Sequence, residues 1–135
     1  MITNYDNMAI VLIHWRIKPE DKHVQTFIDD WKTKFTVKDR SGLVAEFVTE
    51  SLDRTHFPYI TWDLSGGDTG SFRSFVTVGL WQDADQFREQ IAAYFNDKNP
   101  PLDYEQQRRR RVVLRPLLWR LGGAALPNYD FPGVK

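Results

Sequence analysis

The chain has 135 residues and 41% hydrophobic content, which is the size of one domain and enough for a core. Eighteen basic residues balance eighteen acidic ones, so the chain lacks the basic surplus that binding to nucleic acid or an anionic membrane needs. It has no cysteine, which excludes disulfides and thiolate sites and is compatible with the cytoplasm, the expected location. A polar N-terminus and a longest apolar run of Met8–Ile13 predict neither a signal peptide nor a membrane span.

The first predicted element is a strand over Met8–Ile17, which is rich in β-branched and aromatic residues and apolar on both faces. A helix follows, with Pro19 in its first turn. Its apolar residues recur at i, i+3, i+4, i+7 and i+11, and they are Val24, Phe27, Ile28, Trp31 and Phe35. This part of the chain therefore predicts a strand followed directly by an amphipathic helix.

The same pattern occurs again farther along the chain. Leu43–Glu50 predicts a second strand, and Arg73–Gln82 predicts a third that runs into another helix. Asp83 is a good N-cap for this helix, and Gln86 three residues later makes a capping-box-like pair with it. The stripe that this helix is expected to bury consists of Phe87, Ile91, Tyr94 and Phe95.

Two connections and the C-terminal part are less regular. The loop 51–72 is long for a compact domain, and such loops serve as lids, binding loops or arms that dock on another subunit. Leu102–Arg110 predicts a short helical turn and Arg111–Leu121 the last strand, where Pro116 requires an edge position or a bulge. Residues 122–135 are expected to form a tail.

The resulting order, β-α-β-β-α-β, is that of the ferredoxin-like split βαβ arrangement. It predicts one α+β domain over residues 1–135, with an antiparallel four-stranded sheet and two helices on one of its faces. The other face is then bare and apolar. Because such a face must be buried, we expect a homodimer in which two sheets pack together and enclose cavities.

The segment Phe75–Phe87 resembles the strand-to-helix segment of the antibiotic-biosynthesis-monooxygenase-like family, which belongs to the dimeric α+β barrel group. The shared features are a strand that ends in Trp81, the acidic N-cap Asp83 and a Phe in the first helical turn. The likeness covers residues 8–52 and 73–121. It implies a dimeric α+β barrel with a mostly apolar cavity in each subunit.

The chain departs from the family pattern in the length of the loop 51–72 and in the arginine-rich region 101–111. Some members degrade haem with a histidine on the second helix, and this sequence has none between Asp83 and Asn96. The resemblance implies a cofactor-independent, monooxygenase-like oxidoreductase that acts on a small apolar or aromatic substrate without metal or flavin. An isomerase, cyclase or lyase on the same scaffold, or a non-enzymatic ligand-binding dimer, are the alternatives.

His14 is the candidate catalytic base. If Trp15 and its neighbours on one strand face pack on the helices, His14 points into the barrel, where a neutral imidazole can accept a proton. Arg115 on the last strand is the second catalytic candidate, as a stabiliser of the developing anion. In the third strand the aliphatic set is expected to face the helices, which would place Phe75 and Trp81 in the barrel cavity as substrate-binding residues. The alternatives are a hydrogen-bonded core or rim histidine for His14, a solvent-facing edge-strand arginine for Arg115, and interface packing for Phe75 and Trp81.

Five more residues are candidates for substrate binding. Arg16 and Trp119 are expected on cavity-facing strand positions, and Glu46 is a possible counterion for Arg16 or Arg115. His56 and Trp62 on the long loop could close over the cavity mouth. The three histidines lack metal-ligand spacing, so no metal site is predicted. The arginine run 108–111 has no interleaved aromatics, so it is interpreted as a solvated face.

Overall fold

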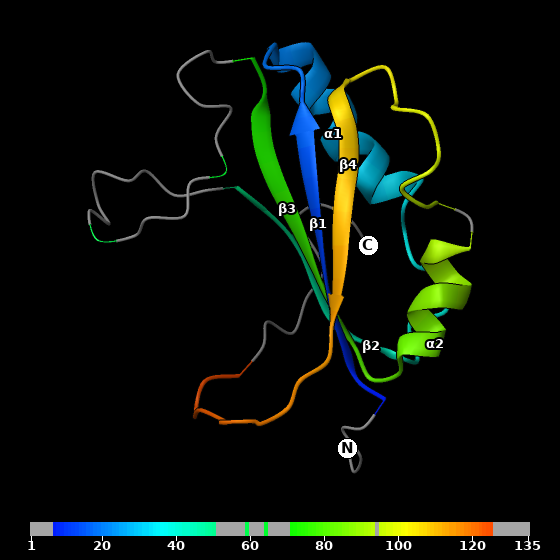
Figure 1. Cartoon of the computed structure of the whole chain (residues 1–135), viewed down its shortest axis with the longest axis vertical. Helices are drawn as coiled ribbons and strands as arrows, with labels where there is room; N and C mark the ends of the chain where they lie inside the picture. Colours follow the sequence, from blue (N-terminus) through cyan, green and yellow to red (C-terminus); the bar gives the residue numbers. More distant parts are fainter. Residues whose placement is uncertain (1–6, 51–58, 60–63, 65–70, 94, 126–135) are drawn as a thin grey trace.

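The computed structural model describes residues 7–50, 59, 64, 71–93 and 95–125 (Figure 1). Its elements, in chain order, are β1 (Ala9–Ile17), α1 (Asp21–Thr33), β2 (Leu43–Glu50), β3 (Arg73–Trp81), α2 (Ala84–Phe87), η3 (Arg88–Ala92) and β4 (Glu105–Leu114). All strand pairs are antiparallel, in the order β2-β3-β1-β4. The sheet is open, and α1 and α2 lie on the same side of it (Figure 1). The predicted α+β class is confirmed.

Strand register decides which side chains meet the helices. Trp15 of β1 is the cross-strand partner of Phe75 of β3, so the two share a face. Trp15 lies 4.9 Å from Phe27 of α1 between ring centroids. Trp81, an even number of residues beyond Phe75, lies 5.9 Å from Phe87 of α2. This side of the sheet is therefore the helix-covered face, and the core lies beneath it.

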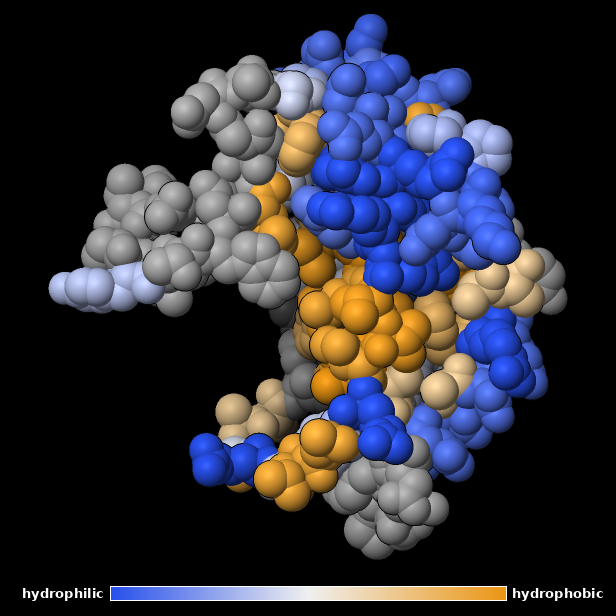
Figure 2. Space-filling model, in the orientation of Figure 1, coloured by the Kyte–Doolittle hydropathy of each residue, from blue (hydrophilic) through white to orange (hydrophobic). Residues whose placement is uncertain are grey.

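The opposite side is called the open face below. Register assigns to it Ile10, Leu12, His14, Arg16, Ala45, Phe47, Thr49, Ser74, Val76, Val78, Leu80, Gln107, Arg110, Val112 and Leu114. Figure 2 shows hydrophobic residues over the lower end of β4, where Val112 and Leu114 are exposed, and a hydrophilic band over its upper half. The open face is thus apolar toward one end and cationic toward the other.

The predicted orientation of β3 is wrong. Phe75, Thr77 and Trp81 are buried against the helices, whereas the aliphatic side chains Val76 and Val78 are on the open face. Alternation with a period of two separates two sets of residues but does not say which set faces the core. The larger rings fill the space beneath the helices, and their size decides the orientation.

The boundaries predicted for the last strand are also wrong. β4 begins at Glu105 and ends at Leu114, so the helical turn expected at Leu102–Arg110 is mostly strand, and the residues after 114 are outside the sheet. The core-facing positions Glu105 and Arg109 are charged, which hides the alternation that identifies a strand. Pro116, which has no N–H to donate, follows shortly after the strand ends.

The second helix starts as predicted and then changes character. Asp83 is its N-cap, and the Asp83 carboxylate accepts a hydrogen bond from the Asp85 N–H at 2.8 Å. After Phe87 the chain continues as the π-helical turn η3, in which the Ala93 N–H donates to the Arg88 carbonyl. Such turns are frequent at functional sites. Among the described residues, no helix has the length and apolar character to cross a bilayer.

Candidate functional site

A cavity of about 360 Å³ lies between the helix-covered face and the helices. Its floor is formed by β1, β2 and β3, and its walls come from the C-terminal end of α1, the segment after it, and α2 with η3. The volume is within the range of small-molecule sites. The largest side chains around it are Trp15, Trp31, Phe35, Trp81, Phe87 and Phe95.

The aromatic wall is packed in fixed positions. The Phe35 and Phe95 rings stack with centroids 4.7 Å apart, and Trp15 stacks on Phe95 at 5.7 Å. Ring pairs at these separations are favourable beyond their burial of apolar area. The wall therefore gives a flat, apolar surface suited to a planar molecule.

Glu46 is the ionisable group that stands out in this cavity. It belongs to β2 and is the cross-strand partner of Gly79, which places it on the helix-covered face. Burial raises the pKa of the Glu46 carboxyl from its ordinary 4.5 to about 7, and the charge of Arg40 offsets part of this rise. No described side chain hydrogen-bonds the carboxyl. Near neutral pH, Glu46 therefore exists in both protonation states and faces open space.

Gly79 creates the space beside this carboxyl. A Cβ placed there would lie 3.0 Å from Trp81 Nε1, closer than ordinary packing allows. Because position 79 carries no side chain, the Trp81 ring lies across the strand and its N–H edge reaches the cavity floor. Thr77 also lines the cavity and accepts a hydrogen bond from Trp15 Nε1 at 3.2 Å, which leaves the Thr77 hydroxyl hydrogen available to a ligand.

Two lysines lie at the exposed side of the cavity. Lys34 lies just after α1, 3.5 Å from Asp30 in an i,i+4 ion pair, and its side chain is largely exposed. Lys38 is exposed and makes no ion pair with a described residue. Glu89 also lines the cavity, which thus has charged side chains of both signs in addition to its apolar aromatic wall.

Two predicted substrate-binding residues, Glu46 and Trp81, come together in the cavity. Phe75 lies on the same sheet face but packs under α1, with its ring centroid 5.3 Å from Phe27. Both aromatic residues were expected on the other face, so their predicted placement is wrong although Trp81 does line a pocket. The expectation that Glu46 neutralises Arg16 is wrong for the same reason, because the two lie on opposite faces.

The remaining predicted site residues lie elsewhere. His14 and Arg16 are on the open face, where the sequence placed them, but the sheet separates them from the cavity. Arg115 and Trp119 follow the end of β4 and are exposed, so neither points from a strand into a pocket. His56 and Trp62 lie outside the described residues.

Sequence reasoning missed Thr77, Trp31 and the lysine pair as cavity residues. Trp31 was visible as part of the apolar stripe of α1, where a buried ring is the ordinary expectation. Thr77 shares its alternation with Trp81, so the correct orientation of β3 would have indicated it. Lys34 and Lys38 belong to an irregular segment, and no periodic pattern could indicate them.

The arrangement is suited to proton transfer. A carboxyl that titrates near pH 7 can both accept and return a proton, and the aromatic wall offers an apolar surface beside it. The described residues contain no cluster of three or more His, Asp or Glu side chains that could hold a metal ion. Comparison with protein-family models and with curated proteins finds no match to this chain.

Proposed function

We propose that this chain is an enzyme in which Glu46 acts as the general base on a small aromatic substrate bound in the cavity. The observation that carries the proposal is a carboxyl with a pKa of about 7 facing an aromatic cavity of about 360 Å³. Buried carboxyls with this property concentrate at catalytic sites. Glu46 takes the role that the sequence assigned to His14, because His14 is on the other side of the sheet.

The reaction class that we propose is a cofactor-independent, monooxygenase-like oxidation, which rests on the family resemblance. Glu46 removes a proton from an acidic C–H or phenol, and the resulting anion reacts with oxygen to give a peroxide anion. Protonation by Glu46 gives a hydroperoxide, which loses water and leaves a carbonyl group. The water consists of the distal peroxide oxygen with its hydrogen and the second hydrogen of the attacked carbon. The substrate supplies all four electrons that reduce oxygen to the carbonyl oxygen and water, so the balance requires only substrate and oxygen. Thr77 and the Trp81 N–H are placed to donate hydrogen bonds to the anion.

We further propose that the chain forms a dimeric α+β barrel of the monooxygenase-like family, with two open faces packed together. The strand order β2-β3-β1-β4 supports a ferredoxin-like arrangement. The apolar side chains Leu12, Val78 and Val112 of the open face support a contact between copies. In this dimer the helix-side cavity belongs to a single subunit.

The first test is to identify a ligand and measure its turnover. Native mass spectrometry of gently purified protein, followed by denaturation, reads any small molecule that the cavity retains. That molecule, or a panel of polycyclic phenols if none is retained, is then incubated with the protein in an oxygen electrode. Oxygen uptake in proportion to product supports the oxidation, whereas turnover without oxygen assigns an isomerase or lyase that uses the same base.

Glu46→Gln tests the general base without changing the shape of the cavity. The amide keeps the shape of the side chain but cannot accept the proton, so we expect kcat to fall by about a hundredfold or more while binding is retained. The matched control is Glu50→Gln, which makes the same change on the same strand at an exposed position outside the cavity. Equal turnover in Glu46→Gln and Glu50→Gln would overturn the assignment of the base.

A further inference from the structure

The cationic end of the open face is a second site, separated from the cavity by the sheet. His14 of β1 and Arg110 of β4 are direct cross-strand partners. Arg16 lies two residues farther along β1 on the same face, opposite Gln107. Three nitrogen-bearing side chains therefore gather at one end of this face.

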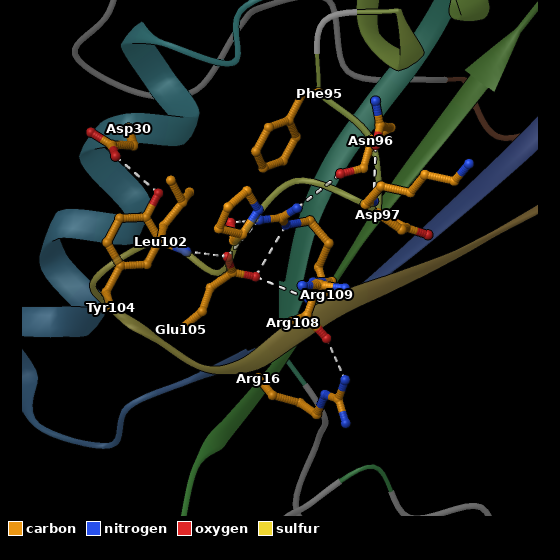
Figure 3. Close-up of polar contacts among 12 residues, drawn as sticks. Arg16, Asp30, Phe95, Asn96, Asp97, Leu102, Tyr104, Glu105, Arg108 and Arg109 are labelled. Atoms are coloured by element: carbon orange, nitrogen blue, oxygen red, sulfur yellow. Dashed lines mark hydrogen bonds and ion pairs between the residues drawn. The ribbon is translucent and has the colours of Figure 1, made fainter.

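Neighbouring groups hold two of these side chains in place. Arg16 Nη1 donates to the Gln107 side-chain oxygen, and Nη2 donates to the Arg108 carbonyl. Arg16 Nε is buried and makes no hydrogen bond with a described residue. Figure 3 shows Arg16 on the other side of the β4 ribbon from Arg109. The guanidinium group is thus oriented before any ligand binds.

The hydrogen bonding of His14 fixes which ring nitrogen is available. His14 Nε2 lies 2.9 Å from Ser74 Oγ. The Ser74 hydroxyl donates to the Leu64 carbonyl, so it accepts from Nε2, and His14 carries its hydrogen there. Nδ1 is then the nitrogen that gains a proton when the imidazole becomes charged. An anion next to Nδ1 would favour that charged form.

In the described part of the chain, no acidic side chain shares the open face with these charges. The described residues of the open face include neither Asp nor Glu, and Arg110 makes no ion pair with a described residue. Glu105 is the nearest acid that acts on Arg16, but on the other face it is already paired with Arg109 at 2.7 Å. Burial, and then the charges of Arg16 and Arg110, lower the pKa of His14. Among the described residues, the side chains at this end of the open face are therefore cationic.

We propose that Arg16, Arg110 and His14 form a binding site for an oxyanion, either a carboxylate or a phosphate group. The exposed Arg110 guanidinium group supplies directed donors, Arg16 adds a positive charge held in place by Gln107 and Arg108, and His14 adds a donor through Nδ1 when it is charged. This site does not depend on the function proposed for the cavity, since it shares no side chain with it. If two open faces pack through their apolar ends, the oxyanion site lies toward the end of that contact.

The NMR resonances of the His14 ring report directly on whether an anion occupies the oxyanion site. We expect inorganic phosphate and acetate, titrated separately at constant ionic strength, to shift the His14 resonances in NMR spectra with saturation. For acetate, which carries one negative charge at both pH values, affinity should be higher at about pH 5.5 than at about pH 8, because the charged imidazole favours the anion. Stronger phosphate binding would assign a phosphorylated ligand, and equal or stronger acetate binding would assign a carboxylate.

Arg110→Gln tests the directed donor. Arg110 is exposed and has no described partner, so the variant should fold and bind the oxyanion about tenfold more weakly. Arg120→Gln removes the same charge from an exposed position after β4 and should leave affinity unchanged. A His14 resonance shift in the wild type that rises linearly without saturating would show only nonspecific screening of charge and would overturn the site. The same loss of affinity in Arg110→Gln and Arg120→Gln would lead to the same conclusion. The wild-type titration decides this even if a variant fails to fold.

Discussion

At the scale of single residues, Glu46 affects the stability of the chain as well as its chemistry. Its pKa is raised in the folded state, so folding is favoured while the carboxyl is protonated and is disfavoured once it ionises. Below the ordinary pKa of 4.5 the carboxyl is protonated in both the folded and the unfolded state, so ionisation does not destabilise the fold. Above about 7 it is ionised in both states, and the destabilisation is complete. The free energy of unfolding should therefore fall as pH rises through this window.

We expect this single group to lower the free energy of unfolding by about 2 kcal/mol between about pH 5 and about pH 8. Glu46→Gln has no such group, so it should lose less stability over the same range and be the more stable protein at the higher pH. Urea unfolding at both pH values measures the difference. Glu50→Gln should follow the wild type, and parallel pH dependence in all three proteins would contradict a raised Glu46 pKa.

Sequence reasoning at this scale identified Glu46 and Trp81 but not their common location. Alternation correctly grouped Phe75 with Trp81 and His14 with Arg16. Alternation could not show which of these two groups the helices cover, because the choice depends on the volume between the sheet and the helices. The absence of a side chain at Gly79, beside Trp81, indicates room for a ligand already in the sequence. The role of Glu46 depends in addition on its burial, which a list of residue types does not show.

At the scale of elements, β4 depends on charged side chains that are buried. Glu105 and Arg109 have fully buried side chains, and Arg109 also donates to the carbonyls of Asn96 and Pro100 (Figure 3). Its guanidinium group lies 4.1 Å from the centroid of the Phe95 ring. This cluster fixes the segment between η3 and β4, and with it the ring that ends the aromatic wall of the cavity.

Arg109→Met should therefore lower the free energy of unfolding by about 3–5 kcal/mol, because it leaves the buried Glu105 charge without its partner. The double variant Glu105→Leu with Arg109→Met removes both charges and should be more stable than the single one. Denaturant titration of the three proteins checks this order. A double variant that is less stable than Arg109→Met would contradict this explanation. The loss of stability would then not come from leaving the Glu105 charge unpaired.

The start of β2 approaches α2 too closely for any side chain at position 42. A Cβ on Gly42 would lie 2.7 Å from Cγ of Gln86. Gly42→Ala should therefore destabilise the chain by about 1–3 kcal/mol. Gly122→Ala is the control, since nothing lies within 4 Å of a Cβ there and its stability should be unchanged. Thermal unfolding compares the two, and equal melting temperatures would contradict the close approach.

The sequence predicted the strands and helices well up to Phe87 and poorly after it. The helical stripe continues past Phe87, but the backbone widens into η3, which no periodicity of apolar residues distinguishes from an α-helix over so short a stretch. In β4 the apolar alternation is replaced by charges that compensate one another. The apolar residues Leu117, Leu118, Trp119 and Leu121 resemble part of a strand in the sequence, yet they lie outside the sheet and are exposed.

At the scale of the whole molecule, the open face is the surface that decides assembly. Val112 lies on it and is 45% exposed, whereas its neighbour Val113 points to the other side of β4 and is 51% exposed. If two open faces pack together, Val112→Glu should convert a dimer into a monomer, because it places a charge in the apolar contact. Light scattering after size-exclusion chromatography measures the mass.

Val113→Glu is the matched control for this experiment, and it should leave the dimer intact. Both positions are exposed in the isolated chain, so neither variant should unfold it. A wild-type protein that is monomeric at all concentrations, or a dimer that both variants break equally, would contradict packing through the open face. The function proposed for the cavity would stand in either case, since its lining comes from one chain.

The central claim is that Glu46 is a base with a pKa near neutrality that faces a ligand cavity. The most direct measurement is an NMR titration of the glutamate side-chain carboxyl carbons, with the Glu46 resonance identified by its absence in Glu46→Gln. We expect a midpoint of about 7, which shifts when a cavity ligand is added. A midpoint near the ordinary 4.5 would show a solvated surface carboxylate and would contradict the proposed base.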